Sequence, residues 1–83
     1  MPTSMHSVYI LQLSNKRIYI GSAKELQRRL REHKAGKVAS TKKSKLHLLK
    51  WYCTFANATN AIAFERYLKS GSGFSWRKKH LGF

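Results

Sequence analysis

The chain has 83 residues, of which 17 are Lys or Arg and only 3 are Asp or Glu, so its formal net charge at pH 7 is +14. This length suits one small domain and is too short for two, and a hydrophobic content of 42% is too high for a disordered basic tail. A folded protein with this much positive charge is typical of proteins that bind polyanions. Nucleic acid is the first expectation for the partner, and an anionic membrane surface is the second.

The start of the chain predicts a β-hairpin. Residues 7–13 are typical of a strand with Val8 and Ile10 on one face and Tyr9 and Leu11 on the other, and residues 17–20 alternate in the same way after a short polar turn. Gly21 is expected to end the second strand. The hairpin brings Tyr9 and Tyr19 onto adjacent strands, but whether their rings share a face depends on the register, which the sequence leaves open.

A basic helix is predicted over residues 22–35. Ser22 and Glu25 have the spacing of a capping box, which satisfies backbone N–H groups at a helix start. Glu25 also precedes Arg29 by one helical turn, and Glu32 follows an arginine by the same spacing, so both acids have expected partners on the helix itself.

A loop and a third strand follow. Residues 36–45 contain four lysines among Ser and Thr, which favours a solvated loop over a specific phosphate contact. Residues 46–55 predict a strand in which every second residue from Leu49 to Phe55 lies on one face. Cys53 is the only cysteine, which excludes a disulfide within the chain and a cysteine-based metal site, and a small buried residue is favoured over a reactive thiol.

Two more helices complete the predicted fold. The first covers residues 57–69, and the SGSG run after it is expected to end it. Residues 74–81 predict a short third helix with Trp76 inward and the basic residues from Arg77 to Lys79 outward. The fold class is therefore α/β of the α+β kind: a small, mostly antiparallel three-stranded sheet flanked by helices, in the order ββαβαα.

One acid of this region is unusual. Glu65 falls in the middle of the apolar arc that Ala61, Phe64 and Leu68 form on their helix. A carboxylate facing a core is costly unless it is paired or bound to a cation. The sequence leaves two explanations for Glu65 open. The carboxylate could pair with Lys69, one helical turn later, or it could bind a cation.

The scarcity of acids restricts the possible chemistry. The chain has three glutamates and no aspartate. Paired-carboxylate glycosidases, carboxylate clusters that hold two metals and Ser-His-Asp triads are therefore hard to build. Hydrolysis would have to depend on one acid together with His, Tyr, Arg or Lys.

Several segments in chain order resemble the GIY-YIG endonuclease family. Val8-Tyr9-Ile10 stands at the position of the GIY segment, and Ile18-Tyr19-Ile20-Gly21 matches the YIG segment. Residues 22–30 (SAKELQRRL), followed by His33, resemble the family's next stretch. The helix containing Glu65 resembles the one that carries the family's metal-binding glutamate.

This resemblance covers roughly residues 7–81 of a single domain, 1–83. It implies a bare catalytic module, a metal-dependent endonuclease that hydrolyses phosphodiester bonds in DNA with little sequence specificity, as in repair or recombination, with RNA left open. Glu65 would be the one direct protein ligand of Mg²⁺ or Mn²⁺, which suits ions that keep much of their water shell.

The resemblance also implies roles for four other residues. Arg29 would stabilise the charge that develops on the phosphate. Tyr9 would act as the general base and Tyr19 would orient the water or the phosphate. His33 would bind the scissile phosphate or relay the proton. Nearby cations and the metal are expected to favour the phenolate of Tyr9.

The chain departs from the family pattern in two places. Ser7 replaces the GIY glycine, a mild change at a position that continues a strand. Many members have an asparagine beyond the glutamate helix, whereas the segment after Lys69 has none. Ser70, Ser72 and Ser75 are the candidates to replace its support.

Affinity for nucleic acid is expected from basic side chains that contact phosphates and carry little base information. These are Lys24, Arg28, Lys37, Lys42, Lys43, Lys45, Lys69, Arg77 and Lys78. No signal peptide or membrane-spanning run is recognised in the sequence, so a cytoplasmic location is expected, with a targeting protein as a possible partner.

Two rival functions are weighed. The same fold could serve as a basic nucleic-acid adaptor with little or no catalysis, which a cleavage assay with and without divalent metal separates from an enzyme. A membrane-surface protein needs a basic helix with bulky apolar residues, and the helix over residues 22–35 offers too few of them.

Overall fold

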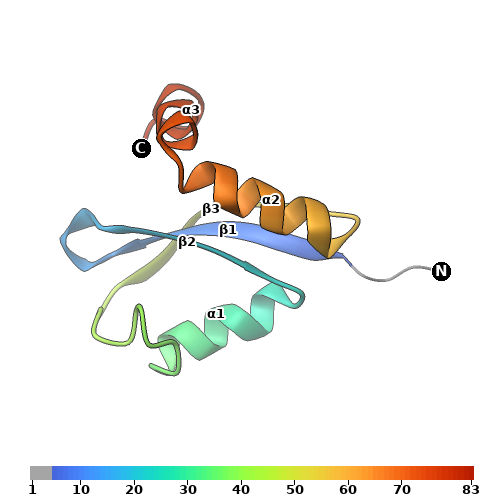
Figure 1. Ribbon diagram of the computed structural model, residues 1–83. Coiled ribbons are helices and arrows are strands. Elements are labelled where there is room, and N and C mark those ends of the chain that lie inside the picture. The colour runs from blue at the N-terminus through green and yellow to red at the C-terminus, as the bar shows by residue number, and fades with distance from the viewer. Residues whose placement is uncertain (1–4) are drawn as a thin grey trace.

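In the computed structural model, which describes residues 5–83, a three-stranded sheet lies between α1 on one face and α2 on the other (Figure 1). The elements are β1 (His6–Leu13), the short 3-10 helix η1 (Ser14–Lys16), β2 (Ile18–Ala23), α1 (Leu26–Lys34), β3 (His47–Phe55), α2 (Ala58–Leu68) and α3 (Gly71–Leu81). This order confirms the predicted ββαβαα arrangement. Among the helices described, none is long and apolar enough to span a membrane.

Strand β1 is the centre of the fold. The strand order is β2-β1-β3 and both neighbours run antiparallel to β1, so the sheet is wholly antiparallel and β2 and β3 are its edges. Val8 and Ile10 pack toward α2, whereas Tyr9 and Leu11 lie in a second cluster toward α1, and these four are at most 1% exposed. Each face of β1 therefore supplies one of the two small cores.

The register of the hairpin places both tyrosines on the α1 face. Tyr9 lies opposite Gly21, and Leu11 lies opposite Tyr19. Residues opposite each other in an antiparallel pair share a face, and so do residues two apart on one strand. Tyr9 and Tyr19 are therefore diagonal neighbours.

A bulge in β3 corrects the prediction that alternate residues of this strand share one face. The register between β1 and β3 shifts so that Ile10 pairs with Trp51 and Leu11 pairs with Leu49. Leu49 consequently packs in the cluster beneath α1, while Trp51 and Cys53 pack toward α2.

Burial raises the pKa of the Cys53 thiol, which favours its unreactive protonated form.

The predicted capping box is wrong. Strand β2 does not end at Gly21 but continues through Ala23, which pairs with Ser7. Helix α1 begins later than expected, and Glu25, at its N-cap position, makes no side-chain capping bond. Continued pairing with β1 keeps Ser22 in the strand, where its hydroxyl has a different partner.

The segment predicted as a solvated loop after α1 is anchored at three points. Val38, Thr41 and Ser44 are buried, at 6%, 1% and 6% exposure. The Ser44 hydroxyl accepts from the backbone N–H of Ser14 at 2.9 Å, which ties this loop to the hairpin turn. The lysines between the anchors are exposed.

The SGSG run begins a helix and does not merely end one. Asn57 caps α2 as predicted, because its side chain accepts from the backbone N–H of Asn60 at 2.9 Å. The Ser70 hydroxyl likewise accepts from Gly73 N–H at 3.2 Å, so α3 starts at Gly71 and not at residue 74. The two helices thus meet in a short corner.

Arg77 does not point outward, which contradicts its expected role in phosphate contacts. It is only 7% exposed, and its guanidinium lies 5.2 Å and 5.8 Å from the ring centres of Phe74 and Phe83. Its Nε has no hydrogen-bond partner among residues 5–83. The aromatic rings on both sides cover the side chain, whereas Lys78 is exposed as expected.

The corner between α2 and α3 generates a stability prediction. A Cβ added at Gly73 would overlap the backbone of Tyr67 and Leu68, whereas one added at Gly71 would meet nothing within 4 Å. We expect Gly73→Ala to lower the free energy of unfolding by about 3 kcal/mol, because backbone atoms must move. Gly71→Ala is the matched control and should stay within about 0.5 kcal/mol of wild type. Urea unfolding of both variants measures this, and equal stabilities would contradict the close crossing.

Candidate active site

A buried hydrogen bond joins Tyr9 on β1 to His33 on α1. The Tyr9 hydroxyl and His33 Nε2 are 2.7 Å apart, and both residues are 0% exposed. The Tyr19 ring lies 5.1 Å from the His33 ring and 6.2 Å from the Tyr9 ring, between centroids. The structure therefore brings together three of the five predicted catalytic residues around one imidazole.

The close approach of the two tyrosines depends on Gly21. A Cβ at this position would lie 2.8 Å from the Tyr9 hydroxyl oxygen and 2.9 Å from Cε2 of Tyr19. Both distances are shorter than real Cβ atoms show, so any other residue would displace a ring. The glycine of the YIG segment thus leaves the space that the cluster occupies.

Thr41 holds the other side of the imidazole, a role that the sequence did not reveal. Its hydroxyl lies 2.7 Å from His33 Nδ1, and its carbonyl oxygen accepts from His47 Nε2 at 3.0 Å. Both nitrogens of His33 are thereby occupied, which leaves neither for direct contact with a phosphate. A threonine in a Ser/Thr/Lys-rich loop offers no pattern that would have distinguished it from its neighbours.

Burial controls the protonation of this pair. It raises the pKa of Tyr9 to about 12, and the Tyr19 side chain adds to the increase, while Arg29 acts in the opposite direction. Arg29 thus favours the Tyr9 phenolate, as expected of a nearby cation, but burial outweighs it in the protein without metal or substrate. Burial also lowers the pKa of His33, with the charge of Arg29 as the next cause, so the imidazole is held neutral.

Arg29 lies at the edge of this cluster. Its Nη1 donates to Oε1 of Glu32 at 3.0 Å, and Arg28 approaches the same carboxylate at 3.4 Å. Glu32, and not Glu25 as predicted, is thus its acidic partner. The hydrogen bond to Glu32 and then the neighbouring Tyr9 hydroxyl raise the pKa of Arg29. A groove of about 270 Å³ is lined by Ala23, Lys24, Glu25, Arg28, Arg29 and Glu32.

Glu65 lies on the other face of the sheet, on α2. Its Oε1 accepts from the Ser22 hydroxyl at 2.6 Å, and its Oε2 accepts from Lys69 Nζ at 2.8 Å. Burial acts to raise the pKa of Glu65, but the hydrogen bonds from Lys69 and Ser22 outweigh it and lower the pKa. Ser22 is the serine that supports this carboxylate, whereas Ser70 caps α3.

The surroundings of Glu65 fit a hydrated divalent cation. Its side chain is 19% exposed and carries a negative charge, while that of Lys69 is 54% exposed and free to move into solvent. Within residues 5–83 there is no cluster of three or more His, Cys, Asp or Glu side chains, so a metal here would have one carboxylate ligand and otherwise water and substrate oxygens.

The end of β2 connects the two halves. Ser22 contacts Glu65 on the α2 face, and the next residue, Ala23, packs against the tyrosine cluster on the α1 face. Because β2 is an edge strand, the two faces meet around its free edge. Tyr9, Tyr19, Arg29 and His33 thus lie together on the α1 side of the sheet, whereas Glu65 contacts β2 from the α2 side.

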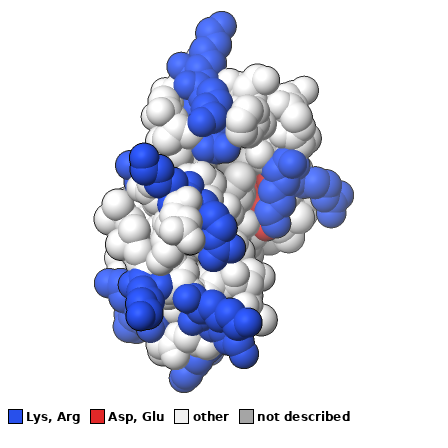
Figure 2. Space-filling view, turned by 90° about the vertical axis from the view of Figure 1, so that its left-hand side faces the viewer, with Lys and Arg blue, Asp and Glu red and all other residues white. Residues whose placement is uncertain are grey.

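Most of the predicted phosphate-binding side chains are exposed. Figure 2 shows Lys and Arg over the whole height of one face, with only a narrow strip of acid. The exposed members of the predicted set are Lys24, Arg28, Lys37, Lys42, Lys43, Lys45, Lys69 and Lys78. Of these, Lys69 is engaged by Glu65 and Arg28 by Glu32.

Comparisons with known proteins identify relatives of the chain in sequence and in structure. The GIY-YIG catalytic domain matches residues 5–79. A UPF0213 protein of Vibrio campbellii is 34% identical over 64 residues, which are 76% of this chain and 62% of the relative. The chain therefore spans less than two thirds of that relative's length.

A solved structure shares the fold. The solution NMR structure of a UPF0213 protein from Bacillus halodurans has a TM-score of 0.55 and 27% identity, covering 87% of this chain and 80% of the other. GIY-YIG domains are nucleases that act on nucleic acid and generally depend on divalent metal ions. With the family's catalytic domain matched over residues 5–79, the chain belongs to the GIY-YIG family.

Proposed function

We propose that this protein is an endonuclease that hydrolyses phosphodiester bonds in DNA with the help of Mg²⁺ or Mn²⁺ bound at Glu65. The observation that carries the proposal is the cluster of Tyr9, Tyr19, Arg29 and His33 on the side of β2 opposite to an accessible carboxylate. Hydrolysis of a phosphodiester needs an arginine that stabilises the phosphate charge, a group that removes a proton from water, and a carboxylate that binds the metal ion.

The proton lost by the attacking water has a route inward. Tyr9 has no exposed surface, so the half-buried Tyr19 is the tyrosine placed to meet water. In the proposed step Tyr19 takes the proton from water, gives its own to Tyr9, and Tyr9 gives its own to Nε2 of the neutral His33. For Nε2 to accept this proton, the neutral His33 must carry its own proton on Nδ1. The hydrogen bond from Nδ1 to the Thr41 hydroxyl holds it there, which makes Thr41 a positioning residue.

Arg29 and Glu65 act on the phosphate from opposite sides of β2. Arg29 exchanges part of its contact with Glu32 for the non-bridging phosphate oxygens, where its charge stabilises the transition state. A divalent ion at Glu65 supplies Lewis acidity toward the phosphate and the leaving oxygen when bound. Lys69 releases the carboxylate to admit it.

DNA is the proposed substrate because the exposed lysines and arginines give a sequence-independent attraction to phosphates. We also propose a cytoplasmic location and a role in repair or recombination, with a partner protein directing the module to its target. These assignments rest on the family and the charge.

The first prediction concerns Glu65. Glu65→Ala should reduce metal-dependent cleavage of DNA by about a hundredfold or more, because the metal loses its one protein ligand. Glu25→Ala is the matched control, since Glu25 is exposed and its side chain makes no capping bond. Binding of Mn²⁺, followed by electron paramagnetic resonance, should be lost only in Glu65→Ala. Full activity of Glu65→Ala would contradict the metal site. If wild type binds DNA but cleaves none of the substrates, the nucleic-acid adaptor would be favoured over the enzyme.

The second prediction concerns Thr41. Thr41→Val leaves His33 Nδ1 buried without a partner and should lower the free energy of unfolding by about 1–3 kcal/mol. It should also slow cleavage about tenfold or more, because the tautomer of His33 is no longer fixed. Thr41→Ser keeps the hydroxyl and should retain most activity. Imidazole ¹⁵N spectra should show the Nδ1-protonated ring in wild type and a mixture in Thr41→Val, and identical spectra would argue against the positioning role.

The third prediction is a pH dependence of stability. The unfolded chain binds a proton at His33 below about pH 6.5, while the folded protein, in which the pKa of His33 is lowered, does not. The free energy of unfolding should therefore decrease as the pH falls from 7 to 5, by at most about 1.4 kcal/mol per pH unit from this residue. His33→Gln should have a shallower slope in urea unfolding across this range. Parallel slopes would contradict the neutral imidazole.

A further inference from the structure

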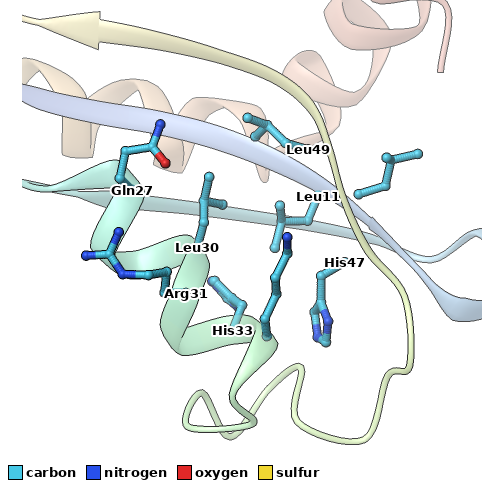
Figure 3. Close-up of a pocket in the computed structure, with 9 residues that line it drawn as sticks. Leu11, Gln27, Leu30, Arg31, His33, His47 and Leu49 are labelled. Carbon is cyan, nitrogen blue, oxygen red and sulfur yellow. The ribbon is translucent and has the colours of Figure 1, made fainter.

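A second concavity lies on the other side of α1 from Arg29. It has a volume of about 320 Å³ and lies between α1 and β3 (Figure 3). Leu11, Leu30 and Leu49 form its apolar part, and the bulge in β3 is the reason that Leu49 reaches it. We refer to it as the α1–β3 pocket.

Hydrogen-bonding side chains lie at both ends of the α1–β3 pocket. Figure 3 shows Gln27 at one end, the leucines between, and His33 with His47 at the other. The Gln27 amide both donates and accepts. His47 Nε2 donates to a carbonyl oxygen, so Nδ1 is the ring nitrogen left to contact a ligand. An apolar middle with polar ends suits a flat heterocycle whose edges carry donors and acceptors.

The charge around the α1–β3 pocket favours a nucleotide over a neutral molecule. Arg31 and Lys34 are among its lining residues and both are exposed, while no acid lines it. Phosphates on either side of a bound base would meet these two cations. With a formal net charge of +14, the whole protein also attracts a polyanion to this face.

We propose that the α1–β3 pocket receives an unpaired nucleobase of the substrate strand. This inference rests on the proposed function and names the substrate class, which is DNA with unpaired nucleotides near the scissile phosphate. His33 connects the two sites, because it lines the pocket and also bonds to the Tyr9 hydroxyl at 2.7 Å. A base at this place would therefore lie next to the proposed proton route.

Removing a base from a perfect duplex requires unpairing and unstacking, which an already unpaired base largely avoids. Binding should therefore favour a duplex with one bulged nucleotide over the fully paired duplex by about tenfold. The experiment uses the Glu65→Ala protein without metal, so that no cleavage occurs, and a bulged 2-aminopurine as the probe. Its fluorescence should rise on binding, since the base leaves its stacked neighbours.

Two variants fill the α1–β3 pocket from opposite walls. Gln27→Trp acts from α1 and Leu48→Trp from β3, and both residues are exposed, so the fold should tolerate each change. Each should remove the tenfold preference and the fluorescence rise while leaving binding to the paired duplex intact. Ala63→Trp, an exposed position on α2 across the sheet, is the matched control and should change neither.

The outcomes separate this inference from the proposed function. Equal affinity for bulged and paired duplexes, or a preference that survives both tryptophan variants, would overturn the pocket assignment and leave the nuclease proposal standing. Failure to bind either duplex at low salt would overturn the proposed function and the pocket assignment with it. Loss of the preference in both variants, but not in the control, supports the inference.

Discussion

The buried hydrogen bond between Tyr9 and His33 is the interaction on which the site depends, because it fixes the distance between the central strand and α1. Each partner needs further support. Gly21 leaves room for the tyrosine, and Thr41 brings a lysine-rich loop down onto the imidazole. A hydrogen bond between fully buried groups is costly to break. In a domain this small, part of the core is therefore also part of the candidate catalytic apparatus.

The scarce acids have sharply different surroundings. Glu32 is shared by two arginines, one of them Arg29, whereas Glu65 is held by a hydroxyl and by an exposed lysine. The first arrangement is a local ion-pair network. The second is a carboxylate kept charged on a partly buried surface with one lysine beside it, and it is the carboxylate that we propose binds the metal ion. In the proposed function the many bases attract phosphate, and the chemistry depends on where these two carboxylates lie.

The sequence was sufficient for what depends on local pattern and family motif. The strands and the order of the helices follow from alternation and spacing, whereas the grouping of Tyr9 with His33 followed from the family motif. It failed where tertiary pairing overrides a local signal. Ser22 looks like a helix cap until β1 pairs with it, and Leu49 changes face only because a bulge intervenes. Thr41 could not be identified, since its role comes from burial and no neighbouring residue predicts it.

The central claim is that a metal at Glu65 and the tyrosine cluster share one active site around the end of β2. Paramagnetic broadening of backbone ¹H–¹⁵N resonances by substoichiometric Mn²⁺ tests this most directly. The account predicts the strongest broadening at Glu65, Ser22 and Ala23, weaker broadening at Tyr19 and Arg29, and none of it in Glu65→Ala. Broadening centred elsewhere, or confined to α2 with β2 unaffected, would contradict a shared site.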